Sequence, residues 1–149
     1  MNYESLKLEK QICFPLYASS RAVTALYRPL LEEFDLTYPQ YLVLLVLWET
    51  DKIPLKEIGD KLFLDSGTLT PLLKKMESSG LLTRDRSDLD ERSLVVSLTT
   101  KGKKLQKKAV CIPERLLEES GLTTEKVQGL KRDLDDLLII LEQKLRNSA

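Results

Sequence analysis

The stretch LDSGTLTPLLKKMESSGLLTRDRSDLDERSLVVSLT, residues 64–99, holds the signals that decide the fold. Either Asp65 or Ser66 caps a helix that runs through TLTPLLKKMESSG and ends at Gly80, because glycine suits the left-handed backbone favoured at helix ends. Two β-prone runs, LLTR and SLVVSLT, then flank the charged turn DLDER. The stretch therefore predicts a helix followed by a two-stranded hairpin.

The residues before this stretch predict a second, short helix. In LKEIGDKLF, residues 55–63, the apolar side chains of Leu55, Ile58 and Leu62 share one side. Two short helices joined by a tight turn make a helix-turn-helix, and the charged hairpin that follows them forms its wing. We expect a winged helix-turn-helix over residues 37–99, a combination that is more specific than either part.

Apolar helices flank this module on both sides. Residues 5–34 show a helical spacing that only Pro15 interrupts, so the helix either kinks there or restarts with Pro15 in its first turn. Thr37 caps the nearly continuous apolar helix that comes next. Residues 100–147 are again helical, with a bend expected at Pro113.

The flanking helices carry more apolar surface than the winged module can cover. The economical arrangement is a symmetric dimer built from residues 5–34 and 100–147. The sequence thus predicts a mainly α fold with a small β-hairpin, in which residues 1–149 form a single domain.

Composition argues against most enzymatic chemistry. The chain has no histidine, no Gly-rich phosphate loop and no CxxC pair, so we expect no enzyme, no metal and no cofactor. Its two cysteines lie far apart, its N-terminus lacks the apolar core of a signal peptide, and its longest apolar run, residues 42–48, is too short to cross a bilayer. We therefore expect a soluble protein of the reducing cytoplasm without a membrane partner.

Charge is balanced overall but unevenly distributed. Residues 74–108 carry an excess of five positive charges between acidic ends, so double-stranded DNA would meet this middle section. In a helix-turn-helix the second helix enters the major groove with its N-terminal residues on base edges and phosphates. The candidates there are short donors, a glycine that allows close approach and two phosphate-binding lysines: Ser66, Thr68, Thr70, Gly67, Lys74 and Lys75. The alternative is that Ser66 and Thr68 only cap the helix.

The wing supplies further candidates. We expect Arg92 to enter the minor groove with Asp90 orienting its guanidinium, and Arg84 and Arg86 to contact phosphates. A solvated charged turn is the alternative for the whole hairpin tip. The lysines that follow are interpreted as a solvated face with a weak long-range attraction for DNA: Lys101, Lys103, Lys104, Lys107 and Lys108. In a dimer, two recognition helices about one turn of DNA apart would read a palindromic operator.

Two sets of motifs resemble a known family. LDSGTLTPLLKKME and RDRSDLDERSLVVSLT are similar to the MarR-type winged-helix regulators, whereas QICFPLYASSR and LTYPQYLVLLVLWE resemble the organic-hydroperoxide-sensing branch, the OhrR group. The resemblance runs from about Leu8 to Pro113. It implies a homodimeric repressor whose N-terminal cysteine is oxidised by organic hydroperoxides, after which operator DNA is released.

The resemblance also assigns roles to residues. By position, Cys13 is the sensing thiol, Tyr27 and Tyr38 hold it by hydrogen bonds within one chain or across a dimer, and Tyr17 is a third aromatic side chain of the pocket. Ser66, Thr68, Thr70 and Arg92 match DNA-contacting positions. Pro15 departs from the family pattern; it would make Cys13 an N-terminal residue of a restarted helix, where thiolates are favoured.

Cys111 leaves two interpretations open. The resemblance offers it as a resolving cysteine that forms a disulfide with Cys13, since two-cysteine members of the branch place that residue on the helix after the wing. Alternatively Cys111 is inert packing, and a low-molecular-weight thiol caps the oxidised Cys13. Three other functions compete with redox sensing: a MarR-type regulator that binds a small aromatic ligand, a thiol peroxidase, and a plain helical interaction module.

Overall fold

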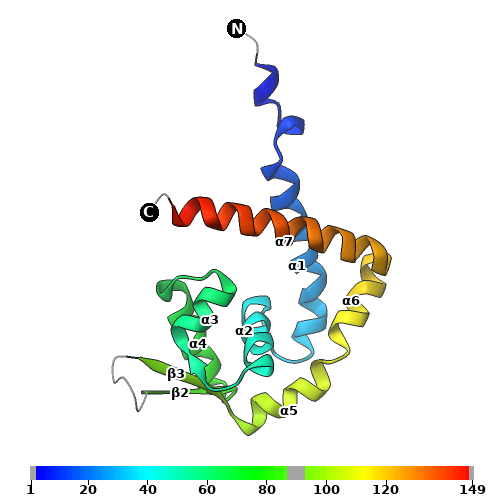
Figure 1. Cartoon of the computed structure of the whole chain (residues 1–149). Coiled ribbons are helices and arrows are strands. Elements are labelled where there is room, and N and C mark those ends of the chain that lie inside the picture. Colours follow the sequence, from blue (N-terminus) through cyan, green and yellow to red (C-terminus); the bar gives the residue numbers. More distant parts are fainter. Residues whose placement is uncertain (1–2, 87–92, 148–149) are drawn as a thin grey trace. The chain divides into compact units, whose positions relative to one another are not determined.

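The computed structural model describes residues 3–86 and 93–147. These residues form a mainly helical chain with a small antiparallel sheet, as the sequence predicts (Figure 1). The chain divides into two compact units, residues 1–112 and 113–149. The elements, in chain order, are η1 (Glu4–Leu6), η2 (Leu8–Lys10), α1 (Cys13–Glu32), α2 (Tyr38–Glu49), β1 (Ile53–Pro54), α3 (Leu55–Leu62), α4 (Ser66–Ser78), β2 (Leu82–Arg86), β3 (Leu94–Leu98), α5 (Thr100–Ala109), α6 (Ile112–Ser120) and α7 (Thr124–Arg146).

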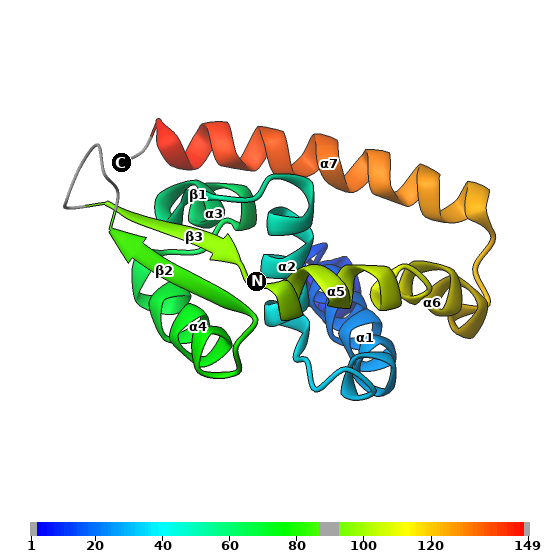
Figure 2. The ribbon, with the colours of Figure 1, turned by 90° about the horizontal axis from the view of Figure 1, so that it is seen from below.

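The winged helix-turn-helix is confirmed within the first unit. Helices α3 and α4 form the helix-turn-helix, and β2 pairs with β3 in an antiparallel register that sets Arg84 opposite Val96 (Figure 2). Helix α2 lies at the centre, buried on most sides. The core side chains are apolar and come from every layer of this unit: Leu30, Leu31, Val43, Leu44, Leu47, Ile58, Leu69, Leu73, Met76, Leu82, Val96 and Ile112.

A third strand joins the hairpin that the sequence predicts. The sheet order is β1-β3-β2, with Ile53 opposite Val96 and Pro54 opposite Val95. Strand β1 has only two residues, too few to show the alternation by which strands are found in a sequence. Proline has no N–H to donate, which restricts it to an edge strand such as β1. The expectation of a two-stranded sheet was therefore incomplete.

The first helix starts later than its apolar spacing indicates. Two 3₁₀ turns occupy the N-terminal residues, and α1 begins at Cys13 with Pro15 as its third residue. The missing N–H of a proline does no harm there, because the first turn of a helix has no partner for its N–H groups. The restart with Pro15 in the first turn is confirmed. Pro29 lies inside the same helix without ending it.

The segment after the wing breaks fully where a bend was expected. Helix α5 stops at Ala109, and α6 starts at Ile112 with Pro113 in its first turn. Gly121 ends α6 with φ +64°, and the side chain of Thr123 caps α7 by accepting a bond from the N–H of Lys126. Apolar side chains of α7 such as Leu138 and Ile140 are exposed in the single chain. A dimer would cover them, but the single-domain and dimer assignments remain predictions.

One close contact joins the start of α5 to the winged module. A Cβ atom added to Gly102 would lie 2.2 Å from the carbonyl oxygen of Leu81, so only glycine allows this approach. The Nε1–H of Trp48 donates to the carbonyl oxygen of Gly102 at 3.0 Å, and the hydroxyl of Thr99 donates to the carbonyl oxygen of Gly80 at 2.7 Å. Helix α5 is thereby fixed to α2 and to the turn between α4 and β2.

We predict that Gly102→Ala lowers the free energy of unfolding by about 1–3 kcal/mol, because the new methyl group must push two backbone segments apart. Urea denaturation of the reduced protein measures this change. Gly129→Ala on α7 is the matched control, since no atom lies within 4 Å of its added Cβ and alanine favours a helix. An unfolding midpoint for Gly102→Ala equal to that of wild type would contradict the contact.

Candidate redox site and nucleic-acid interface

Three tyrosines meet where α1 packs on α2. The ring centre of Tyr27 lies 4.9 Å from that of Tyr38 and 5.8 Å from that of Tyr41. Tyr41 also contacts Trp48 edge-on, with ring centres 6.2 Å apart. The aromatic side chains therefore form a continuous series of ring contacts from Tyr27 on α1 to Trp48. The indole N–H of Trp48 donates a hydrogen bond to α5.

The environment keeps these phenols protonated. Burial, and then the neighbouring Tyr38 and Tyr41, raise the pKa of Tyr27 to about 12. Burial also raises the pKa of Tyr38 and of Tyr41. Hydroxyl groups with raised pKa values remain donors at neutral pH, which is what a thiolate beside them requires.

Cys13 does not reach these tyrosines within one chain. It is the first residue of α1 and is exposed, as its predicted position in a restarted helix requires. Fourteen residues separate it from Tyr27 on the same helix, which is about 21 Å at the helical rise. Tyr27 and Tyr38 are brought together as predicted, but Cys13 of the same chain does not lie beside them.

Tyr17 lies one helical turn after Cys13 and has a partner that sequence reasoning missed. The guanidinium of Arg21 donates to the Tyr17 hydroxyl at 3.2 Å and lies 5.5 Å from the ring centre. Both residues are exposed. The spacing of four residues between an aromatic and a basic side chain on one helix was the available signal.

Cys111 lies close enough to Tyr41 for an ionised thiol to act on the phenol electrostatically. It sits in the turn between α5 and α6 rather than on a helix, is half-buried, and donates its S–H to the carbonyl oxygen of Lys108 at 3.3 Å. After burial and Tyr38, the charge of an ionised Cys111 is a further cause that raises the pKa of Tyr41. Both cysteines are free thiols.

The N-terminus of α4 is capped by Asp65. Its carboxylate accepts bonds of 2.9 Å from both the N–H and the hydroxyl of Thr68, and these bonds lower the pKa of Asp65. Ser66 is therefore free of the capping role and is exposed at the helix start. A Cβ at Gly67 would lie 2.9 Å from the Asp65 carboxylate, which explains the glycine. Thr70 is half-buried on the same helix.

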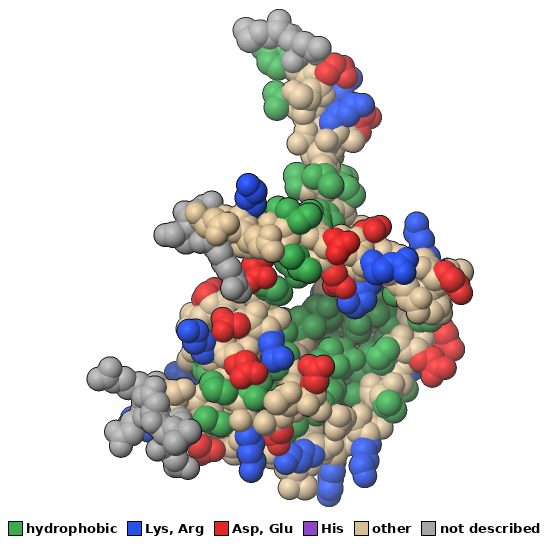
Figure 3. All heavy atoms as spheres, in the orientation of Figure 1, with side chains coloured by type: hydrophobic (Ala, Val, Ile, Leu, Met, Phe, Trp, Pro, Cys, Tyr) green, Lys and Arg blue, Asp and Glu red, His purple; other side chains and the backbone are tan. Residues whose placement is uncertain are grey.

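The predicted basic contacts differ in their surroundings. Lys74, Lys75 and Arg86 are exposed, and lysine and arginine side chains also gather along α5 at the lower edge of the molecule in Figure 3. Asp90 and Arg92, predicted for the minor groove, lie outside the described residues.

Arg84 joins the wing to the recognition helix. Its side chain is 15% exposed and forms an ion pair of 2.7 Å with Glu77, whose other oxygen accepts the N–H of Arg84 at 3.0 Å. The guanidinium lowers the pKa of Glu77 by hydrogen bonding. Sequence reasoning missed Glu77, because nothing in the sequence shows that β2 returns along α4. Arg84 as a phosphate contact remains a prediction.

Asp51 connects α2, the sheet and α5. One carboxylate oxygen accepts the N–H groups of Leu98 at 2.8 Å and Lys52 at 2.9 Å, and the other pairs with the ammonium of Lys103 at 2.9 Å. Burial alone would raise the pKa of Asp51, but these bonds outweigh it and hold the pKa below its ordinary value. The carboxylate is therefore ionised at neutral pH.

Comparison with known proteins identifies the family. The model of the SarA/Rot transcriptional regulators matches residues 25–109. The organic hydroperoxide resistance transcriptional regulator of Bacillus subtilis (strain 168) is 52% identical over 142 residues, covering 95% of this chain and 97% of that protein. The chain belongs to the MarR-type winged-helix regulators. The resemblance that the recognition helix and wing predicted is thus confirmed.

Solved structures of a related MarR-type regulator support the same assignment. Reduced AbfR bound to DNA is 37% identical, with a TM-score of 0.76, and the match covers 95% of this chain and 99% of that one. AbfR, from Staphylococcus epidermidis, was also solved in a disulfide form, with a TM-score of 0.61 at 37% identity over 96% of this chain and 95% of that one. Within the part of this regulator that the structure describes, no helix is both long and apolar enough to cross a membrane.

We predict that Asp51→Asn destabilises the regulator most at neutral pH. Because the pKa of Asp51 is lowered on folding, its ionised form stabilises the fold above the ordinary carboxylate pKa, and this contribution disappears as the pH falls through the lowered value. Urea denaturation should show a loss of roughly 1 kcal/mol at pH 7 that shrinks below about pH 4. Lys103→Gln, which leaves the bond from Leu98 intact, should lose less. A loss of unfolding free energy that is as large below about pH 4 as at pH 7 would contradict this role of Asp51.

Proposed function

We propose that this chain is a homodimeric DNA-binding repressor that senses organic hydroperoxides by oxidation of Cys13 and releases its operator when oxidised. The observation that carries the proposal is an exposed thiol at the start of α1 in a chain that also holds a protonated tyrosine pair and a winged helix-turn-helix. The relatives support it, since one is an organic hydroperoxide resistance regulator and another was solved on DNA in its reduced form.

The winged module supplies the DNA-reading surface. Helix α4 presents Ser66 and Gly67 at its exposed start, where base edges and phosphates are met in the major groove. Lys74, Lys75 and Arg86 are exposed and positioned for phosphates. Thr68 keeps its predicted contact role while its hydroxyl also holds the Asp65 cap. Two copies of this surface read the two halves of a palindrome.

A dimer completes the sensor. The start of the chain exposes large apolar side chains such as Leu8, Ile12 and Phe14, which a second subunit would cover. Because Cys13 is about 21 Å from Tyr27 along α1, the thiol of one subunit is held by Tyr27 and Tyr38 of its partner. The two phenolic hydroxyls donate to the thiolate, and Phe14 and Tyr17 provide apolar surface for the tail of an organic peroxide.

The chemistry of sensing consumes one peroxide per thiol. The thiolate attacks the terminal oxygen of the hydroperoxide, the O–O bond breaks, and the alkoxide leaves and takes up a proton to become an alcohol. Sulfur is oxidised by two electrons to a sulfenic acid while the peroxide is reduced. Because the thiol must be reduced before each signal, we place the regulator in the cytoplasm, with no catalytic cycle of its own.

We further propose Cys111 as the resolving thiol. An electrostatic influence of Cys111 on Tyr41, whose ring contacts Tyr27, supports a position near the tyrosines proposed to hold the partner's oxidised thiol. Its thiol attacks the sulfenic acid, an S–S bond forms and water leaves. The relative AbfR, solved in a disulfide form, supports this step. The competing product is a mixed disulfide with a low-molecular-weight thiol.

The first test follows operator release. Fluorescence anisotropy on DNA from upstream of the regulator's own gene should show that about one equivalent of cumene hydroperoxide per subunit releases the wild type and leaves Cys13→Ser bound. Release of both proteins would favour a small aromatic ligand or non-specific damage. If both wild type and Cys13→Ser stayed bound to the DNA, Cys13 would be a packing residue and not a sensor. Repeated consumption of peroxide with a reductant present would point instead to a thiol peroxidase.

The second test identifies the oxidised product. After treatment with peroxide, non-reducing electrophoresis should show wild type as a covalent dimer, and Cys111→Ser as a monomer whose mass reveals a sulfenic acid or a bound small thiol. Cys111→Ser should still be released from DNA, but recover more slowly or overoxidise. A covalent dimer that persists in Cys111→Ser would refute the assigned resolving role.

A further inference from the structure

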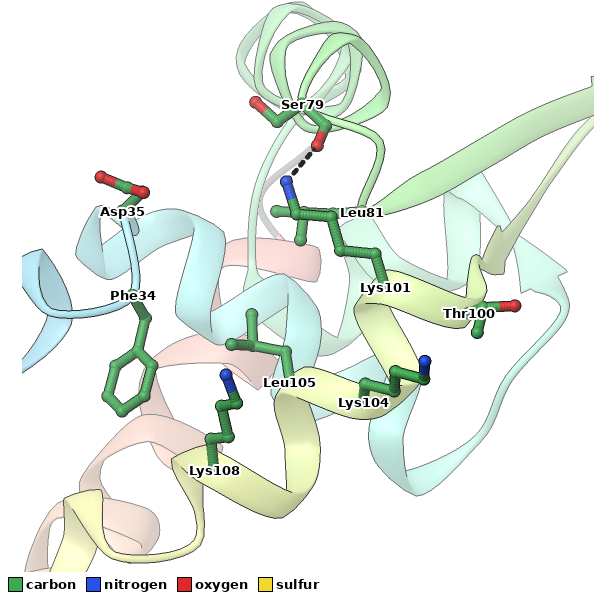
Figure 4. A pocket seen from close by; sticks show the side chains of 9 residues that line it. All are labelled: Phe34, Asp35, Ser79, Leu81, Thr100, Lys101, Lys104, Leu105 and Lys108. Atoms are coloured by element: carbon green, nitrogen blue, oxygen red, sulfur yellow. Dashed lines mark hydrogen bonds between the residues drawn. The ribbon is translucent and has the colours of Figure 1, made fainter.

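A hollow of about 700 Å³ opens beside the C-terminal end of the recognition helix (Figure 4). All the segments around it belong to the first unit: the turn after α1, the turn after α4, and helix α5. Its lining is apolar at the floor and lysine-rich at the rim: Phe34, Asp35, Ser79, Leu81, Thr100, Lys101, Lys104, Leu105 and Lys108.

Lys101, Lys104 and Lys108 line the same side of the hollow, because residues three and four positions apart lie on one face of a helix. Lys101 crosses the hollow and donates to the carbonyl oxygen of Ser79 at 2.8 Å, as Figure 4 shows. That bond places a positive charge on the C-terminal end of α4, where the helix dipole is negative and would otherwise repel an anion. Among the described residues, no carboxylate forms an ion pair with Lys104 or Lys108.

The floor of the hollow explains how the other two ammonium groups are presented. Leu81 is almost fully buried, and Leu105 and Phe34 are half-buried, so together they offer an apolar surface to lysine stems. Lysine side chains lay their methylene groups along such a surface and keep the charge at the water boundary. Lys103 lies elsewhere on α5, where it pairs with Asp51.

We propose that Lys101, Lys104 and Lys108 form a second row of phosphate-binding residues. This row contacts the DNA backbone beside the recognition helix, α4. The inference rests on the proposed DNA binding and extends it to a helix outside the winged module. The bond from Lys101 to Ser79 holds the row against the end of α4, the helix that carries the exposed Lys74 and Lys75, within one compact unit. Lys104 and Lys108 are about 6 Å apart along the helix axis, which is comparable to the rise over two phosphates of one strand. Asp35 on the opposite side of the hollow disfavours a small anion enclosed there.

The experiment measures the salt dependence of binding to a fluorescein-labelled 24-base-pair duplex of random sequence, by anisotropy of the reduced full chain between 50 and 200 mM salt. Each lysine that neutralises a phosphate adds about 0.9 to the slope of log K against log salt. The variant Lys104→Gln/Lys108→Gln should therefore lower the slope by up to about 3.6 for the four lysines of a dimer. This variant should still discriminate operator from random DNA as wild type does.

The control removes the same number of charges elsewhere. Lys126→Gln/Lys131→Gln on α7 should leave the slope unchanged, and all the proteins should melt at the same temperature by circular dichroism. An unchanged slope in Lys104→Gln/Lys108→Gln, with wild type still bound to DNA, overturns the inference but not the proposed function. If dodecanoate then binds wild type and not this variant, the hollow is a site for an organic anion. A wild type that binds no DNA would overturn both.

Discussion

The approach of Gly102 to the carbonyl oxygen of Leu81 is the constraint on which the arrangement of the first unit depends. It brings the backbone of α5 against the turn that ends the recognition helix and starts the wing. The bond from Trp48 to the Gly102 carbonyl ties the same turn of α5 to the central helix α2. Asp51 completes the junction by joining the end of β3 to Lys103. Any movement of α5 would therefore also displace α4, the proposed recognition helix, and the base of the wing.

Specific contacts connect the tyrosines of the proposed sensing site to the proposed DNA-reading surface through this junction. The aromatic chain from Tyr27 through Tyr41 ends at Trp48, which bonds α5, and Lys101 of α5 bonds the end of α4. The Glu77–Arg84 pair then transmits the position of α4 to the wing strand β2. Each link is a specific bond or ring contact between packed elements, so displacement of the tyrosines has a short physical route to the DNA-binding groups.

Under the proposed function, the stiffness of α1 makes sensing require two chains. A continuous helix holds Cys13 and Tyr27 about 21 Å apart, and no side-chain movement can close that distance. In the proposed dimer the thiol and its hydrogen-bond donors belong to different subunits, so oxidation of the cysteine would alter the contact between the subunits. A disulfide or a bulky thiol at that place would strain the interface and change the spacing of the two recognition helices, which a palindromic operator requires to be constant.

Periodicity, capping residues and turn chemistry in the sequence by itself determined the order of the main helices and the winged helix-turn-helix, because these depend on interactions between neighbouring residues. At Pro15 the sequence left a kink and a restart as alternatives, and the structure decided for the restart. The candidate site residues Cys13, Tyr27 and Tyr38 were predicted through resemblance, and the structure brings the rings of the two tyrosines into contact. Only the tertiary structure decided that Asp65 rather than Ser66 caps α4, that Arg84 pairs with Glu77, and that a third strand joins the sheet. It also brought Cys111 within electrostatic range of Tyr41 and gathered the lysines of α5 around one hollow. The Asp65 cap is a local bond for which the sequence offered two equivalent candidates, whereas the third strand joins residues distant in the chain, and no local pattern records which distant surfaces will pack together.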